Sequence, residues 1–238
     1  MSPSPPDAAI LCGGLGTRLR PALPDLPKAL APVGGRPFLE GLVIALETWG
    51  LTRIVLCIGS GGAAIRRHFA AWPGCAALIF SEESSPLGTG GALGLARAHL
   101  HSDPVLVLNG DSMVPGLDLA ALQSALDQAG AGAAGALVVV PAGARADAGT
   151  VTLDPDRRVI GFAEKTASPA GAYHSAGIYL LRRALLDSIP PAPTQLSLEL
   201  DLIPHWLPRG LLGFPHAGAL VDIGTPERLH RAQAEAAR

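Results

Sequence analysis

The stretch AAILCGGLGTRLRP (residues 8–21) joins a short apolar run to a glycine-rich segment that carries two arginines. The run AAILC (8–12) does not alternate polar with apolar residues, so it predicts a strand that is covered on both faces. Glycines after such a strand let backbone N–H groups approach a phosphate closely, and arginines neutralise its charge. The stretch therefore predicts either a sharp turn or a phosphate-binding loop at the end of a buried strand.

The same order of strand and helix repeats along the first half of the chain. Continuous apolar runs predict strands at 8–12, 53–58, 76–80, 104–109 and 136–140. Between them, apolar residues spaced by three and four predict helices at 38–50, 63–72, 89–100 and 118–130. This alternation indicates crossover units. We therefore expect an α/β, Rossmann-like fold with a mostly parallel, mixed sheet and helices on both faces.

The second half of the chain is more mixed. It holds short strand candidates at 150–153, 158–163, 175–181 and 211–214, and helix candidates at 194–207 and 225–237. No linker, repeat or change of composition separates the two halves. We therefore expect one domain over residues 8–238, preceded by a short disordered tail over residues 1–7.

Composition is that of a globular protein, with 48% hydrophobic and 16% charged residues in a chain of 238. The net charge of −2 and the lack of a basic block argue against nucleic acid as a partner. No apolar stretch reaches about eighteen residues, which predicts no membrane span, and the N-terminus has no signal-peptide pattern. Three cysteines beside apolar runs are typical of buried, reduced thiols. We therefore expect a cytoplasmic protein.

Ligands bind beyond the carboxyl ends of the strands in sheets of this type, and four segments follow predicted strands. The first runs from Gly13 to Arg20 and continues to Lys28. It lacks the spacing of a P-loop, and a dinucleotide fingerprint would need a glycine where Leu19 stands. The flanking arginines and lysine favour a phosphate-binding loop over a plain glycine turn.

The second segment, GSGGAA (59–64), is a fair match to the dinucleotide-binding pattern G-x-G-x-x-A. Glu82 and Glu83 follow the next predicted strand, where a ribose-binding acid would stand in such a site. The segment therefore keeps an NAD-dependent oxidoreductase open, beside the simpler interpretation of a glycine-rich turn from strand to helix.

The third and fourth segments each place an acid at the end of a predicted strand. Asp111, in Asn109-Gly110-Asp111, suits Mg²⁺, which takes one or two protein carboxylates together with phosphate oxygens; an Asx turn is the alternative. Near the C-terminus, Thr225 and Pro226 are expected to begin the last helix. That explanation leaves Asp222, a second acid after a strand, unexplained.

In this order the motifs resemble those of the sugar-1-phosphate nucleotidyltransferases, also called nucleoside-diphosphate-sugar pyrophosphorylases. The family pattern is G-G-x-G-T-R-L, P-K, a base-reading loop, G-D, E-K, N-A-G and D-x-G-T; this chain has its counterparts at 13–19, 27–28, 83–91, 110–111, 164–165, 175–177 and 222–225. The resemblance covers nearly the whole chain and makes 59–64 an ordinary turn. Three positions depart from the pattern: Ser175 replaces the usual Asn, Leu200 stands where Lys is frequent, and Cys12 stands where Ala is common.

The resemblance implies a single nucleotidyltransferase domain of glycosyltransferase-A-like fold. It implies in-line attack of a sugar 1-phosphate on the α-phosphorus of a nucleoside triphosphate, assisted by Mg²⁺. Arg18, Lys28 and Asp111 would be catalytic. Asp111 and Asp222 would bind Mg²⁺. The nucleotide would be bound by Leu11, Gly13, Gly14, Gly16, Thr17, Arg18, Glu83, Pro86, Gly88, Thr89 and Asn109. The sugar phosphate would be bound by Glu164, Lys165, Ser175, Gly177 and Glu199. No protein nucleophile is needed, so positioning and positive charge would supply most of the catalysis.

Two segments indicate a branch of this family. PLGTGGAL (86–93) and GRPFLE (35–40) look most like D-glycero-D-manno-heptose-1-phosphate guanylyltransferases, which favours GTP and heptose 1-phosphate as substrates. Mannose-1-phosphate guanylyltransferases and N-acetylmuramate-1-phosphate uridylyltransferases stay open as alternatives. Glu83 also favours GTP, because one carboxylate can accept hydrogen bonds from both N1–H and N2–H of guanine. The alternative is that backbone amides read the base.

A non-enzymatic role is the remaining alternative, since some chains of this fold act as regulatory subunits. Such chains usually lack a metal-binding acid or the signature arginine, whereas Arg18, Lys28, Asp111 and Asp222 are all present here. The sequence therefore favours an active enzyme, and leaves open whether it forms a homo-oligomer.

Overall fold

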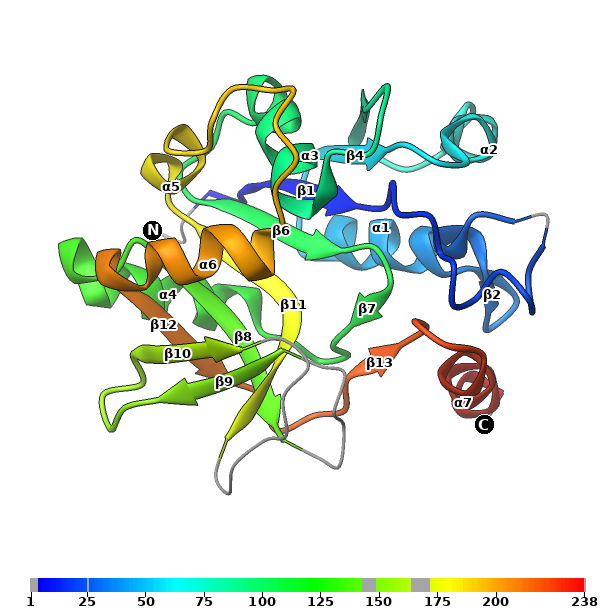
Figure 1. The fold of residues 1–238 in the computed structure, drawn as a ribbon. Coiled ribbons are helices and arrows are strands. Elements are labelled where there is room, and N and C mark those ends of the chain that lie inside the picture. The colour runs from blue at the N-terminus through cyan, green and yellow to red at the C-terminus, as the bar shows by residue number, and fades with distance from the viewer. Residues whose placement is uncertain (1–3, 25, 143–148, 164–171, 238) are drawn as a thin grey trace.

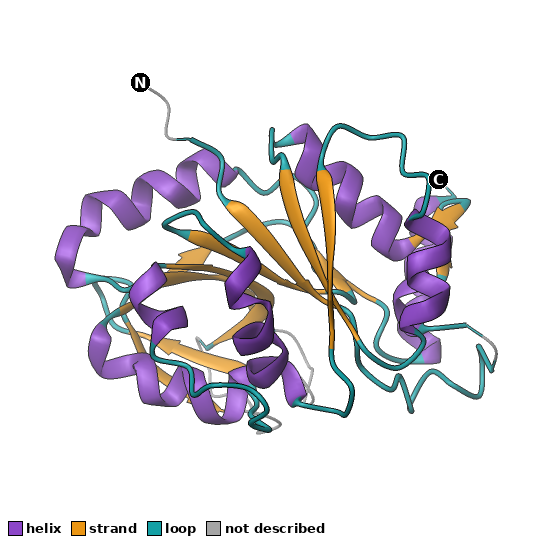
Figure 2. Cartoon of the chain, turned by 90° about the horizontal axis from the view of Figure 1, so that it is seen from above, coloured by secondary structure: helices purple, strands orange, loops and turns teal. Residues whose placement is uncertain are grey.

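The computed structural model describes residues 4–24, 26–142, 149–163 and 172–237. A nine-stranded mixed sheet runs through the molecule, with helices on both of its faces (Figures 1 and 2). The strand order is β10-β9-β11-β6-β1-β4-β5, with β8 beside β11 and β12 beside β8. The expected α/β, Rossmann-like architecture is therefore confirmed.

The parallel part of the sheet comes from the first half of the chain. It consists of β1 (Asp7–Leu11), β4 (Arg53–Ile58), β5 (Ala77–Glu82) and β6 (Val105–Asn109). The chain builds β1, β4 and β5 outward in one direction, and then returns to place β6 on the other side of β1. This reversal makes a switch point at the carboxyl ends of β1 and β6, where open sheets of this type bind ligands.

Two hydrophobic cores, one on each face, explain why the strand sequences do not alternate with polar residues. In β1, Ala8 and Ile10 enter one core and Ala9 enters the other. The first core is covered by α1 (Phe38–Thr48), α2 (Gly62–Phe69) and α4 (Leu119–Ala129), and the second by α3 (Gly88–Ala96), α5 (Arg183–Asp187) and α6 (Ile203–Trp206). Burial on both faces requires apolar side chains at successive positions.

The second half adds the mixed part of the sheet. β11 (Tyr173–Leu181) runs antiparallel to β6, to β8 (Gly135–Pro141) and to β9 (Thr150–Leu153). β10 (Val159–Ala163) forms an antiparallel pair with β9, and β12 (Leu211–Pro215) lies parallel to β8. Short 3₁₀ segments η1 (Lys28–Leu30), η2 (Arg97–His99) and η3 (Gly130–Gly132) complete the connections.

Two small antiparallel pairs lie outside the main sheet. β2 (Pro32–Val33) pairs with β3 (Arg36–Pro37), and β7 (Ser112–Met113) pairs with β13 (Val221–Asp222). After β13 the chain enters α7 (Pro226–Ala236), which begins at the capping residue Thr225 as expected. Figure 1 shows β7, in green, beside β13, in orange-red, so a segment from the middle of the chain meets one from near its C-terminal end there.

The helix expected at 194–207 is shorter than the sequence predicts. It begins with the π-helical turn η4 (Leu198–Leu202), continues as α6 and ends as the 3₁₀ turn η5 (Leu207–Arg209). Ser197 caps it by accepting a hydrogen bond from the amide of Leu200 at 3.0 Å. The preceding backbone serves α3 instead: the carbonyl of Leu196 accepts from the amides of Gly90 and Gly91, which are among the unpaired donors at a helix start.

At the N-terminus, β1 already includes Asp7. Its carboxylate accepts hydrogen bonds from the amides of His101 and Ser102, and Pro6 is buried. The division into a tail over 1–7 and a domain over 8–238 stays a prediction. Within the described residues, none of the helices has the length and apolar character needed to cross a membrane.

Candidate active site

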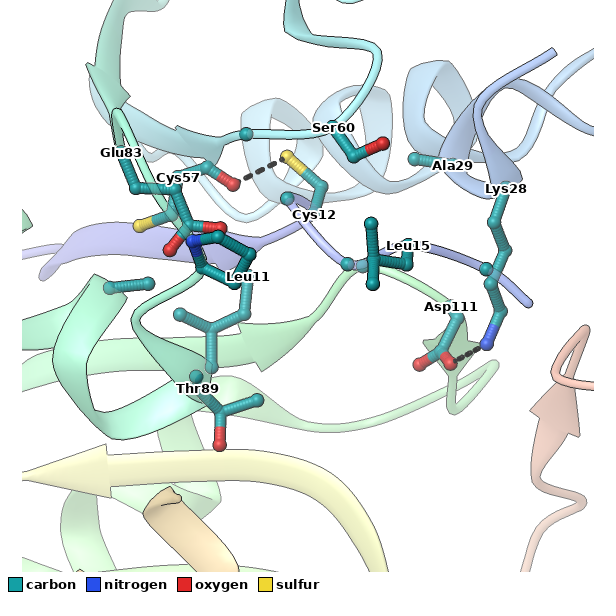
Figure 3. A pocket seen from close by; sticks show the side chains of 18 of the residues that line it. Leu11, Cys12, Leu15, Lys28, Ala29, Cys57, Ser60, Glu83, Thr89 and Asp111 are labelled. Carbon is teal, nitrogen blue, oxygen red and sulfur yellow. Dashed lines mark hydrogen bonds and ion pairs between the residues drawn. The ribbon is translucent and has the colours of Figure 1, made fainter. Parts of the chain in front are cut away.

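A cavity of about 760 Å³ opens at the carboxyl ends of β1, β4, β5 and β6. The loops that follow these four strands form its walls, as expected for a switch point. Figure 3 shows Glu83 at one end of this cavity and Lys28 with Asp111 at the other. All the residues predicted to bind nucleotide line it, namely Leu11, Gly13, Gly14, Gly16, Thr17, Arg18, Glu83, Pro86, Gly88, Thr89 and Asn109.

The glycine-rich loop after β1 packs tightly against the turn after β4. A Cβ on Gly13 would lie 2.9 Å from the amide nitrogen of Gly59, and the carbonyl of Gly13 accepts a hydrogen bond from Ser60 at 3.1 Å. Gly16 adopts a φ of +60° and would place a Cβ 3.1 Å from that of Lys28. Glycine is therefore required where the loop closes on its neighbours, and the buried side chain of Leu19 anchors its far end.

The turn at 59–64 serves this packing. Gly61 has a φ of +75° at the start of α2, and a Cβ there would lie 2.6 Å from Cγ of Pro27. Glu82, expected as a ribose-binding acid in the dinucleotide interpretation, instead bonds Arg66 on the exposed side at 2.7 Å. These contacts account for the glycines of the turn without a dinucleotide.

Glu83 lies at the cavity wall. Its Oε2 accepts a hydrogen bond from the amide of Leu87 at 2.9 Å, which holds the side chain against the start of α3. Its Oε1 lies so close to the turn that a Cβ on Gly59 would be 2.5 Å away. Burial raises the pKa of the neighbouring Cys57 thiol to about 12, and the negative charge of Glu83 adds to that shift.

Lys28 and Asp111 face each other at the opposite end of the cavity. Lys28 Nζ donates to Oδ2 of Asp111, and both side chains are largely buried, with 17% and 29% of their surface exposed. Lys28 comes from η1, after the glycine-rich loop, and Asp111 from the turn after β6. The pair therefore ties the loop to the strand end, with a positive charge directed into the cavity.

Asp222 lies beside this rim, held there by the β7–β13 pair, but it is not itself one of the residues that line the cavity. It is in register with Ser112, and the amide of Ile223 donates to the carbonyl of Asp111 at 3.0 Å. Oδ1 of Asp222 accepts from the amide of Gly224 at 2.7 Å and from Arg228 at 3.1 Å. The two predicted metal ligands, distant in sequence, thus lie on adjacent stretches of backbone.

The donor set at this rim fits Mg²⁺. No group of three or more His, Cys, Asp or Glu side chains converges in the described part of the chain, so a closed protein cage is not formed there. Two carboxylates are what Mg²⁺ takes when phosphate oxygens and waters supply its other ligands. Asp111 and Asp222 would hold the ion, next to the cavity end that contains Lys28.

Asn109 and Gly177 connect this cavity to β11. Gly177 has a φ of +70° at a register shift of β11, and a Cβ there would lie 2.7 Å from Nδ2 of Asn109. Oδ1 of Asn109 is buried and has no hydrogen-bond partner within the described ranges. Ser175 Oγ accepts from the amide of Gly177 and contacts the Tyr179 hydroxyl, each at 3.3 Å.

Glu199 lies behind the cavity wall. Its Oε2 accepts a hydrogen bond from Thr89 Oγ1 at 2.7 Å, and Thr89 in turn accepts from the amide of Leu198 at 2.8 Å. Glu199 therefore contacts a lining residue and is not itself part of the lining, as is also true of Ser175 and Gly177. Glu164 and Lys165, predicted to bind the sugar phosphate, lie outside the described residues.

Two residues at this site had no place in the sequence motifs. Gln195 lines the cavity from the segment that crosses α3, in a stretch expected to be helical. Arg228 bonds Asp222 from the first turn of α7. A cation is unfavourable at a helix N-terminus, so an arginine in the first turn of the predicted last helix is the sequence feature that could have indicated a role for Arg228. No pattern in the sequence indicates Gln195.

Comparison with known proteins finds nucleotidyltransferases by both family model and sequence similarity. Residues 7–238 match the family model described as "Nucleotidyl transferase". The chain is 34% identical to a mannose-1-phosphate guanylyltransferase of Mycobacterium tuberculosis, over 98% of this chain and 65% of that protein. It is 30% identical to a D-glycero-alpha-D-manno-heptose 1-phosphate guanylyltransferase of Aneurinibacillus thermoaerophilus, over 96% of this chain and 97% of that protein.

A solved structure, that of HddC from Yersinia pseudotuberculosis complexed with GMP-PN, superposes with a TM-score of 0.80 at 28% identity. That match covers 97% of this chain and 99% of the other. The chain thus spans about the full length of the heptose relative, and 65% of the length of the mannose relative from Mycobacterium tuberculosis.

Proposed function

The chain belongs to the nucleotidyl transferase family, and on that premise we propose that it transfers GMP from GTP to a manno-configured sugar 1-phosphate, releasing pyrophosphate. One observation carries this proposal: Lys28 and Asp111 meet at one end of a 760 Å³ cavity whose walls include the glycine-rich loop, and Asp222 lies directly beside them. A triphosphate at that end would place its base toward Glu83, at the other end (Figure 3).

The chemistry needs no protein nucleophile. An oxygen of the sugar 1-phosphate forms a bond to the α-phosphorus of GTP, and the bond from that phosphorus to the β-phosphate oxygen breaks, so pyrophosphate leaves. Two anions must meet, and the main obstacle is their repulsion. Mg²⁺, when bound by Asp111 and Asp222, would neutralise phosphate charge.

Residues of the chain supply the remaining charge and orientation. Arg18 and Lys28 both line the cavity and place fixed positive charge where the phosphates would lie. The glycine-rich loop offers backbone N–H groups to the triphosphate. Asn109 lines the same cavity, and its side-chain amide would hydrogen-bond a substrate hydroxyl.

Guanine is the proposed base because Glu83 is held at the cavity wall by Leu87. A carboxylate has about four acceptor positions, so the bond to Leu87 leaves capacity for N1–H and N2–H of guanine. Uracil offers only one such donor, and cytosine and adenine place an acceptor beside their amino group. GTP should therefore be preferred over UTP, with CTP and ATP poor donors.

The sugar is proposed to be a manno-configured 1-phosphate because the names of both relatives contain that configuration. Full-length coverage of the heptose relative favours D-glycero-D-manno-heptose 1-phosphate, whereas sequence identity is somewhat higher to the mannose relative. An acceptor panel at fixed GTP and Mg²⁺ decides between them. We expect pyrophosphate release with heptose 1-phosphate to exceed that with mannose 1-phosphate; higher turnover with N-acetylmuramate 1-phosphate would contradict the assignment.

A further inference from the structure

Arg228 occupies a position that helix energetics do not favour. It is the third residue of α7, whose N-cap is Thr225 and whose first residue is Pro226. The first turn of a helix exposes unpaired N–H groups and carries partial positive charge, so an anion such as Glu227 is stabilising there and a cation is not. The start of α7 therefore does not explain why an arginine stands at position 228.

The guanidinium instead serves Asp222. Its Nη1 donates to Oδ1 of Asp222 at 3.1 Å, while the amide of Gly224 donates to the same oxygen at 2.7 Å. Both charged side chains are largely buried, with 20% of Arg228 and 14% of Asp222 exposed. Two donors from different directions on one oxygen restrict rotation of the carboxylate about its Cβ–Cγ bond.

Gly224 permits this arrangement. A Cβ at that position would lie 2.9 Å from Oδ1 of Asp222 and 3.4 Å from Nη1 of Arg228. The backbone between β13 and α7 thus leaves room for the carboxylate and the guanidinium to meet. The same virtual Cβ would lie 3.5 Å from Nζ of Lys28, so the Asp222–Arg228 pair adjoins the Lys28–Asp111 pair.

We propose that Arg228 is a positioning residue that orients the Asp222 carboxylate for the metal ion. The inference rests on the metal role of Asp222 in the proposed function. Partners that hydrogen-bond a ligating carboxylate fix its orientation, and their loss typically costs 10–100-fold in metal affinity. The charge of Arg228 alone would act in the opposite sense, since a cation near the site repels another cation. The sign of the effect therefore separates positioning from simple charge neutralisation.

The test is binding of Mn²⁺ alone to the full chain, followed by loss of the free-ion EPR signal. Arg228→Met keeps much of the aliphatic stem and removes the donor, and Arg228→Ala is a second variant. Arg231→Met is the matched control, because Arg231 is exposed on the same helix and its loss changes the net charge equally. Circular dichroism melts establish that each protein is folded.

We expect Arg228→Met to weaken Mn²⁺ binding roughly tenfold, at the low end of the usual range, and Arg231→Met to leave it within twofold. Binding by Arg228→Met as tight as, or tighter than, wild type overturns the positioning role. Asp222→Asn separates this from the proposed function: if that variant binds Mn²⁺ as wild type does, the metal site itself is wrong. If Asp222→Asn loses binding and Arg228→Met does not, only the inference about Arg228 fails.

Discussion

The amide of Ile223 donates a 3.0 Å hydrogen bond to the carbonyl of Asp111, which brings Asp222 next to the cavity rim that Asp111 lines. The two-residue strands β7 and β13 that carry this contact lie far apart in the sequence and outside the main sheet. Lys28 joins the same rim from the end of the glycine-rich loop. The site is thus assembled from three distant segments around the end of β6.

Arg18→Ala should lower kcat by roughly 10²-fold, because it removes one preorganised positive charge beside the reacting phosphates. Arg20→Ala is the matched control: Arg20 is exposed two residues further on and does not line the main cavity. Steady-state kinetics of pyrophosphate release measure both. A change in KM alone, with kcat kept, would mean that Arg18 only binds substrate.

Glu83→Gln should reduce the preference for GTP over UTP, measured as the ratio of their kcat/KM values. The amide oxygen of Gln can still accept from Leu87, so α3 is expected to start normally, while the charge proposed to pair with guanine is lost. Glu82→Gln is the control, since Glu82 bonds Arg66 on the outer side of the turn. An unchanged ratio in Glu83→Gln would assign base reading to backbone amides.

Gly177→Ala should lower kcat/KM roughly tenfold or more, because the new methyl would displace Asn109 at the cavity wall. Gly116→Ala is matched for backbone strain: Gly116 has a φ of +74°, against +70° for Gly177, but a Cβ there would meet nothing within 4 Å. Both variants should lose about 1–2 kcal/mol of stability from the left-handed conformation. Equal activity in the two variants would show that Asn109 does not need its present position.

Only Cys75 should react with iodoacetamide in the native protein at pH 8. Cys75 is exposed, whereas Cys12 and Cys57 are buried. Burial raises the pKa of both thiols, that of Cys57 to about 12, so both stay protonated and unreactive. Intact-protein mass spectrometry should show one adduct before unfolding and three after it; rapid native labelling of Cys57 would contradict its burial.

The same shifts predict how stability depends on pH. A Cys57 thiol whose pKa burial raises from the ordinary 9.0 to about 12 in the folded protein favours the folded state fully below pH 9. That contribution is lost as the pH rises from 9 toward 12, since the unfolded chain releases the proton first. Urea unfolding should therefore show falling stability across this window in the wild type, and a smaller fall in Cys57→Ala.

Much of the parallel sheet could be predicted because burial on both faces leaves a continuous apolar run, as in β1 and β4. The two-residue strands β7 and β13 could not be predicted, since a strand of two residues is too short to show a pattern of apolar residues. The helix expected at 194–207 was wrong in its first turn, because the carbonyl of Leu196 accepts hydrogen bonds from the amides at the start of α3. Such tertiary contacts override local patterns.

The residues that the motifs assign to nucleotide binding all line one cavity, because they lie at the ends of parallel strands that meet there. The motifs gave Glu199 a contact with the sugar, whereas in the structure it bonds Thr89 behind the cavity wall. The roles of these residues in substrate binding stay predictions. Arg228 was missed because no local spacing in the sequence reveals its contact with Asp222.

The most direct test of the central claim follows both products of one reaction. The protein is incubated with GTP, Mg²⁺ and a manno-configured sugar 1-phosphate, and GDP-sugar and pyrophosphate are quantified together by mass spectrometry and a coupled assay. We predict equal amounts of both from the wild type, and loss of most of both in folded Asp111→Asn, which keeps the shape of the side chain without its charge. Near-wild-type turnover by Asp111→Asn would contradict the account. So would the absence of GDP-sugar when the wild type is given mannose 1-phosphate or D-glycero-D-manno-heptose 1-phosphate.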